Sequence, residues 1–133
     1  MPPDAVFFTD RNLGANYFPA EMRKAGYCIV THDEHFDLRQ DVLDPEVIEE
    51  CGRNGWLLIT ADRDMPRRWA DDIRKAQIGV FCQTNNHQGP RIWIPRIVSC
   101  KDKLLRAVKN WDKPFIGFIS AEKKPSIRHV KSF

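Results

Sequence analysis

The stretch "WLLITADRDM", residues 56–65, is a short apolar run that ends in two aspartates with one residue between them. Its length and its β-branched residues predict a buried β-strand. A charge at the end of such a strand costs free energy unless a partner satisfies it. Asp62 and Asp64 therefore indicate a site where this strand comes to the surface.

Similar apolar runs recur along the chain, and segments with helical periodicity separate them. The predicted strands are "DAVFFTD" (4–10), "YCIVTH" (27–32), "WLLITAD" (56–62), "IGVFCQ" (78–83) and "KPFIGFIS" (113–120), and the predicted helices cover 16–26, 44–55, 65–76 and 91–111. Strands that alternate with helices indicate βαβ units. We expect an α/β fold with a central, mostly parallel sheet of four or five strands flanked by helices.

The length of 133 residues predicts one domain over residues 1–133, with a flexible basic tail from about residue 121. The first residues lack the pattern of a signal peptide, and no apolar run is long enough for a membrane span. We therefore expect a cytoplasmic protein with no membrane partner. The four cysteines stand singly, which favours reduced and mostly buried thiols.

Charge is divided unevenly between the two halves of the chain. Residues 1–66 hold 6 Lys and Arg against 13 Asp and Glu, a net charge of −7, and residues 67–133 hold 15 against 5, a net charge of +10. Any one of these charges is explained equally well by a solvated surface. Their segregation suits a protein that holds a polyanion beside an acidic site.

Four aspartates are predicted to converge at one edge of the sheet. Asp10 ends the first strand and Asp62 the third, and the carboxyl ends of parallel strands share an edge. Asp64 projects to the same side as Asp62 if the chain stays extended, and Asp44 begins a helix that starts at that edge. Helix capping is the alternative role for Asp44 and for Asp64.

Clustered carboxylates either take up protons or bind a cation. Oxygen ligands favour Mg²⁺ or Mn²⁺, and such ions activate water and neutralise phosphate oxygens. This predicts hydrolysis of a phosphodiester bond. The basic residues expected to hold RNA are Arg63, Arg67, Arg68, Lys123, Lys124 and Arg128.

Three motifs carry a resemblance to a known family. They are "TDRNLG" (9–14), "LDPEVIEECGRNG" (43–55) and "LLITADRDM" (57–65). With them the chain resembles the PIN-like nucleases, and in particular the compact PIN-like group that includes VapC-type toxins. The resemblance covers roughly residues 5–82, and the C-terminal part agrees only in pattern.

The resemblance implies a three-layer PIN-like domain and a ribonuclease that depends on Mg²⁺ or Mn²⁺, of the kind used as the toxin of a toxin–antitoxin pair. By this likeness Asp10, Asp44, Asp62 and Asp64 bind the metal or orient the attacking water, and Asn12 positions one of them. Asp41 or Glu46 could take the place of Asp44. The implied partners are RNA and an antitoxin protein, and a homodimer is left open.

Other interpretations of the same residues compete with this one. A PIN-like module that binds RNA or protein without cutting is the main alternative. A phosphatase of the haloacid dehalogenase type is disfavoured, because it needs a second aspartate where Asn12 stands. The segment from His32 to His35 fits no strong metal motif and is interpreted as a solvated polar loop, and Trp69 is assigned to the core in preference to base stacking.

Overall fold

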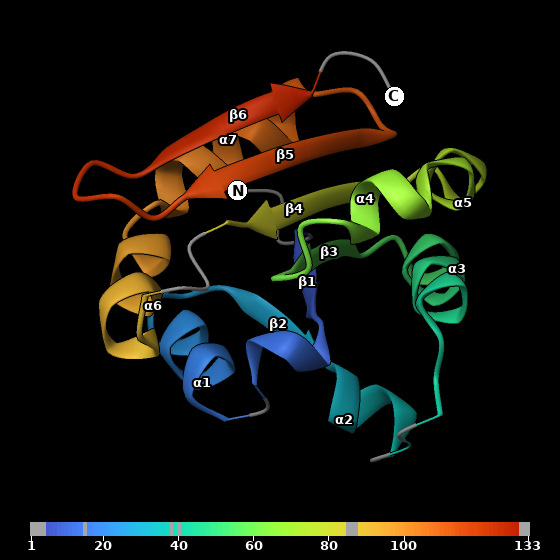
Figure 1. The fold of residues 1–133 in the computed structure, drawn as a ribbon, viewed down its shortest axis with the longest axis horizontal. Coiled ribbons are helices and arrows are strands. Elements are labelled where there is room, and N and C mark those ends of the chain that lie inside the picture. Colours follow the sequence, from blue (N-terminus) through green and yellow to red (C-terminus); the bar gives the residue numbers. More distant parts are fainter. Residues whose placement is uncertain (1–4, 15, 38, 40, 85–87, 131–133) are drawn as a thin grey trace.

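The computed structural model describes residues 5–14, 16–37, 39, 41–84 and 88–130. Its centre is a six-stranded sheet with the order β2-β1-β3-β4-β5-β6 (Figure 1). The strands are β1 (Val6–Thr9), β2 (Cys28–Thr31), β3 (Leu57–Thr60), β4 (Gly79–Gln83), β5 (Phe115–Ser120) and β6 (Ser126–Val130). All neighbours are parallel except β5 and β6, so the prediction of a mostly parallel α/β sheet is confirmed.

Helices cover both faces of the sheet and complete three layers (Figure 1). They are the 3-10 helix η1 (Arg11–Leu13), α1 (Tyr17–Lys24), α2 (His32–Phe36), α3 (Asp44–Asn54), α4 (Met65–Arg68), α5 (Ala70–Ala76), α6 (Pro90–Val98) and α7 (Lys101–Asn110). One core joins the sheet to α1, α6 and α7, and a second joins it to α2, α3, α4 and α5. None of these helices, within the part of the chain that the structure describes, is long and apolar enough to span a membrane.

Alternation along the strands explains the two cores. On β1, Phe7 faces the first core and Phe8 the second, and on β3, Leu57 and Leu58 divide in the same way. All four side chains are at most 2% exposed, as expected for strands covered on both faces. This double burial is why the sequence shows short unbroken apolar runs.

Two of the predicted helices are each divided into two. The segment 91–111 forms α6 and α7, because the Ser99 hydroxyl donates to the Arg96 carbonyl at 2.7 Å while the Cys100 amide turns to Ile97. This local bond competes with continuation of the helix. The segment 65–76 forms α4 and α5, separated at Trp69.

The C-terminal segment contains a strand that the sequence analysis missed. Residues 126–130, assigned there to a flexible tail, form β6 and pair with β5 in the register Ile116↔Val130 to Ser120↔Ser126. Backbone pairing places the strand, and Ile127 packs on the first core while Val130 packs on the second. Arg128 and His129 between them hid the apolar alternation. The sheet therefore has six strands, where four or five were predicted, and β5 is not its edge.

Candidate active site

The edge of the sheet formed by the carboxyl ends of β1 and β3 carries the predicted aspartates. The two strands are parallel neighbours, with Thr9 opposite Ile59. The Asp10 amide continues their ladder by donating to the Ile59 carbonyl at 3.0 Å. The expectation that Asp10 and Asp62 share an edge is therefore met. Asp10 is only 8% exposed, which makes it a buried carboxyl group.

A single hydroxyl joins the two strand ends. Thr60 Oγ1 donates to Asp10 Oδ2 at 3.1 Å and accepts from the Asp62 amide, also at 3.1 Å. Asn12 completes the arrangement, because its Nδ2 donates to the same hydroxyl at 3.1 Å and its Oδ1 accepts from the Ala61 amide at 2.9 Å. The Thr60 side chain is fully buried. Thr60 and Asn12 thus fix Asp10 relative to the turn that carries Asp62.

The environment of Asp10 raises its pKa. Burial is the largest cause, and the negative charge of Asp44 adds to it, while hydrogen bonds from the Arg11 amide and the Thr60 hydroxyl act in the opposite direction. Two carboxylates that repel each other in a poorly hydrated place favour binding of a cation or a proton. Asp10 and Asp44 form such a pair.

Asp44 lies in the first turn of α3. The helix is capped by Leu43, without a side-chain capping bond, so the capping role considered for Asp44 is wrong. Asp44 Oδ2 instead accepts from Trp69 Nε1 at 3.1 Å, and this bond orients the carboxylate. Trp69 itself packs on the second core, which confirms the preference for a core role.

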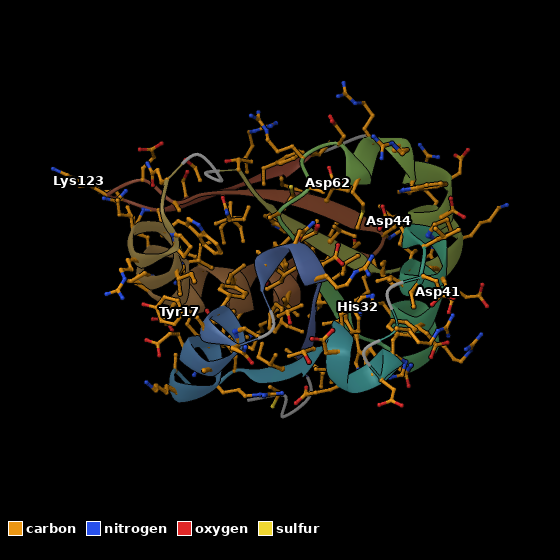
Figure 2. All side chains as sticks on the ribbon, turned by 60° about the horizontal axis from the view of Figure 1, so that its bottom comes forward. Tyr17, His32, Asp41, Asp44, Asp62 and Lys123 are labelled. Atoms are coloured by element: carbon orange, nitrogen blue, oxygen red, sulfur yellow. The ribbon has the colours of Figure 1, made fainter. Side chains whose placement is uncertain are left out.

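The two alternatives to Asp44 are paired elsewhere. Arg39 contacts Asp41 at 3.1 Å and Glu46 at 3.5 Å, at the outer rim of the molecule. Figure 2 places Asp44 between Asp62 and the rim where Asp41 lies. The carboxylate whose charge raises the pKa of Asp10 is that of Asp44, while the charge of Arg11 lowers it. The geometry therefore favours Asp44 as the second carboxylate.

Asp62 and Asp64 occupy the turn after β3. Asp62 Oδ1 accepts from the Asp64 amide at 3.0 Å, which holds the turn closed. Asp64 precedes α4 but makes no capping bond with its side chain. Its carboxylate pairs with Arg67 at 3.1 Å and is 62% exposed. Asp64 is thus exposed at the surface, unlike the buried Asp10.

Asp10 and Asp44 offer carboxylate oxygens, which are the donors that Mg²⁺ prefers. Among the residues that the structure describes, no three His, Cys, Asp or Glu side chains are grouped as ligands of one ion. Mg²⁺ is usually held by one or two carboxylates and keeps several waters. Asp10 and Asp44, with oxygen donors and mutual repulsion, fit that pattern.

The segment that was expected to be a solvated loop is helix α2. Thr31 and Glu34 form a capping box at its start, with bonds of 3.1 and 2.9 Å. His32 is buried against Phe8 and Phe36, and burial lowers its pKa. The expectation of a solvated loop was wrong, because the capping box and the aromatic contacts outweigh the polar composition.

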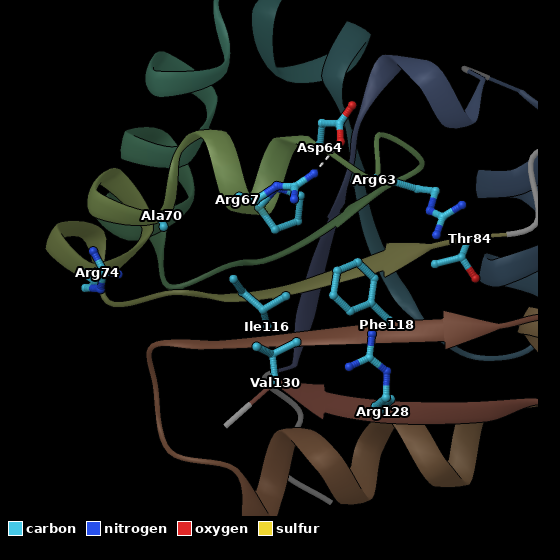
Figure 3. Close-up of a pocket in the computed structure, with 11 residues that line it drawn as sticks. Arg63, Asp64, Arg67, Ala70, Arg74, Thr84, Ile116, Phe118, Arg128 and Val130 are labelled. Carbon is cyan, nitrogen blue, oxygen red and sulfur yellow. Dashed lines mark hydrogen bonds and ion pairs between the residues drawn. The ribbon is translucent and has the colours of Figure 1, made fainter. Parts of the chain in front are cut away.

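A groove of about 880 Å³ is lined by Asp64 at one end, and we call it the arginine groove. Its cationic lining consists of Arg63, Arg67, Arg74 and Arg128 (Figure 3). Three of these were predicted to bind RNA. Three other residues given that role do not line it: Arg68 is exposed on α4, and Lys123 and Lys124 are exposed in the turn between β5 and β6.

The sequence analysis missed Thr60 as the centre of the hydrogen-bond network, and it missed Arg74 and Phe118 in the groove. A signal for Thr60 was present, because the threonine belongs to the motif "TADRD" at the end of β3. No comparable local signal marked Phe118, because its place in the groove depends on the pairing of β5 with β6, which sets Arg128 beside it.

The fold and the site define a three-layer α/β domain with an acidic carboxyl edge. A comparison with protein-family models matches residues 5–85 to the PIN-like domain. The chain belongs to the PIN-like domain family, whose members are commonly nucleases that use divalent metals. No curated protein and no solved structure matches the chain.

Proposed function

We propose that this protein is an endoribonuclease that hydrolyses RNA phosphodiester bonds with Mg²⁺ or Mn²⁺ and acts in the cytoplasm. One observation supports this most strongly. The Thr60 hydroxyl connects Asp10 and the Asp62 turn at one sheet edge, and the charge of Asp44 reaches Asp10 there. A structural role alone does not explain a buried carboxyl group at the carboxyl edge of the sheet with a second carboxylate acting on it.

In this proposal, Asp10 and Asp44 hold the cation. A divalent ion at that position supplies Lewis acidity toward a phosphate oxygen and lowers the pKa of a water. Asp62, oriented by the Asp64 amide, accepts the proton of the attacking water or completes the ligand set. Thr60 and Asn12 are positioning residues. Arg63 binds the phosphate group that lies next to the scissile bond.

Cleavage of labelled RNA with Mg²⁺, with Mn²⁺ and with EDTA tests the proposal. We expect cutting with either metal and none with the chelator. Asp10→Asn and Asp62→Asn should each lower the rate by at least about a hundredfold, the scale of losing one stabiliser of transition-state charge. Asp112→Asn, an exposed aspartate remote in sequence from the motifs, is the matched control and should cut like the wild type.

We further propose that the ribonuclease is the toxin of a toxin–antitoxin pair, because of the likeness to compact PIN-like toxins. Induced expression of the wild type in bacteria should stop growth and degrade RNA, and Asp10→Asn should do neither. Equal arrest by both forms would contradict the toxin role. RNA binding without cleavage under all metal conditions would instead support the noncatalytic module.

A further inference from the structure

The hairpin of β5 and β6 extends the sheet beyond the residues that match the family, 5–85. On the face that carries α3 and α5, the second core reaches Ile116 but leaves Phe118 and Val130 only partly buried. The arginine groove opens over these three side chains and continues to Arg63 and Asp64 at the carboxyl edge (Figure 3). It therefore runs from the hairpin to the turn after β3 that carries Asp64, whereas Asp10 lines a separate pocket.

The lining of the groove combines positive charge with an aromatic ring. It holds four arginines and one carboxylate, Asp64. Arg67 pairs with Asp64 and Arg74 with Asp71. The guanidinium of Arg128 lies over the ring of Phe118, 5.0 Å from its centroid, and nucleic-acid bases stack on aromatic rings and on arginine planes.

We propose that the arginine groove binds a single strand of nucleic acid, with one unpaired base on the Arg128–Phe118 pair and with phosphates at Arg63 and Arg67. The inference rests on the proposed function and adds to it a subsite on the hairpin. The groove ends at Arg63 and Asp64, next to Asp62 in the turn after β3, and this position favours nucleic acid over an acidic peptide. A duplex cannot use this subsite, because its base faces are already stacked.

Binding can be measured separately from cleavage. Asp10→Asn in EDTA serves as the host protein, and the probe is a fluorescein-labelled RNA of twelve nucleotides followed by fluorescence anisotropy. In this host, Arg128→Gln should weaken binding about tenfold, within the range of about 1–3 kcal/mol for the stacking of one base. Phe118→Leu keeps apolar volume but removes the ring face, and it should weaken binding in the same direction.

Lys124→Gln is the matched control, because it removes one positive charge from the same hairpin outside the groove. It should change the affinity by less than about twofold at 0.15 M salt, where exposed charges are largely screened. A probe with abasic sites should lose most of the difference between the host and its Arg128→Gln variant. The same RNA annealed to its complement should compete poorly.

Equal effects of Arg128→Gln and Lys124→Gln would overturn the inference. An abasic probe or a duplex that binds as tightly as the single strand would also overturn it, because the groove would then hold only the phosphate backbone. If the groove variants lose affinity but the wild type cuts no RNA, the subsite stands and the nuclease proposal fails. If the wild type cuts RNA and both groove variants cut it equally fast, the nuclease proposal stands and the subsite fails.

Discussion

Replacing Thr60 with valine removes one hydroxyl and keeps the shape of the side chain. That hydroxyl donates to Asp10 and accepts from Asn12 and from the Asp62 amide, each at 3.1 Å. The variant therefore leaves a buried carboxylate and a backbone N–H without their partner. We expect it to destabilise the fold and to disturb both strand ends.

The expected magnitude follows from the number and type of bonds. A neutral hydrogen bond contributes about 1 kcal/mol net and one to a charged group about 1.5–3 kcal/mol, so the loss of two neutral bonds and one charged bond in Thr60→Val should cost about 3.5–5 kcal/mol. An unfolding entropy of about 2.1 cal/mol/K per residue makes each 1 kcal/mol worth about 3–4 °C in a chain of this length. The melting temperature should therefore fall by about 12–18 °C.

Thermal and urea unfolding in EDTA, with the RNA cleavage assay in parallel, measure the effect. Thr84→Val is the matched control, because within the described residues its half-buried hydroxyl makes one bond, to the Ile119 carbonyl at 3.1 Å. It should lower the melting temperature by at most about 4 °C, the value of one neutral bond. Thr60→Ser keeps the hydroxyl and should recover most of the lost stability and activity.

Equal melting temperatures of Thr60→Val and Thr84→Val would contradict a central role of the Thr60 hydroxyl in stability. Cleavage of RNA by Thr60→Val as fast as by the wild type would contradict its role in the site, because the hydroxyl would then not position the two carboxylates.

Three further predictions concern the carboxylates and the packing of β4. Burial and Asp44 raise the pKa of Asp10, so the folded protein binds this proton more tightly than the unfolded chain does. The free energy of unfolding therefore falls as pH rises from the ordinary pKa of an aspartate through the raised pKa of Asp10. In EDTA, Asp10→Asn should remove this decline and melt higher than the wild type at pH 7, and a lower melting temperature at every pH would contradict it. Mg²⁺ at a hundred times its dissociation constant should stabilise the wild type by about 2.7 kcal/mol, and calorimetry should show little of this for Asp10→Asn. Gly79→Ala should destabilise by about 1–3 kcal/mol or more through overpacking, since a Cβ there would lie 2.2 Å from the Phe115 ring. Gly89→Ala, where no described atom lies within 4 Å of the added Cβ, should cost only about 1 kcal/mol or less in urea unfolding, through the loss of a glycine N-cap of α6.

Much of the architecture could be predicted from local patterns. Strands buried on both faces appear as unbroken apolar runs, and the helix signals between them predicted parallel neighbours. Because parallel strands share a carboxyl edge, the positions of Asp10 and Asp62 at that edge followed without coordinates. Even the acidic start of α3 could be placed.

Partners distant in the sequence were beyond these patterns. The hydrogen bonds of Thr60 to Asn12 and Asp10 join residues that are 48 and 50 positions apart in the sequence. A local sequence pattern cannot predict such bonds. Asp44, Asp41 and Glu46 are equivalent as sequence, and only the packing of Trp69 and the position of Arg39 distinguish them. Strand β6 was missed for a related reason. Few of its residues are apolar, and it forms a strand by pairing with β5.

The sequence by itself therefore determined the fold class, the edge where the carboxylates gather and the family likeness. These depend on hydrophobic period, turn residues and charge, which act between near neighbours. The tertiary structure decided which carboxylates interact, that His32 is buried in a helix, and that Arg128 lies on Phe118 at the groove. Those outcomes depend on burial and hydrogen bonding between distant segments, which exist only once the sheet has formed.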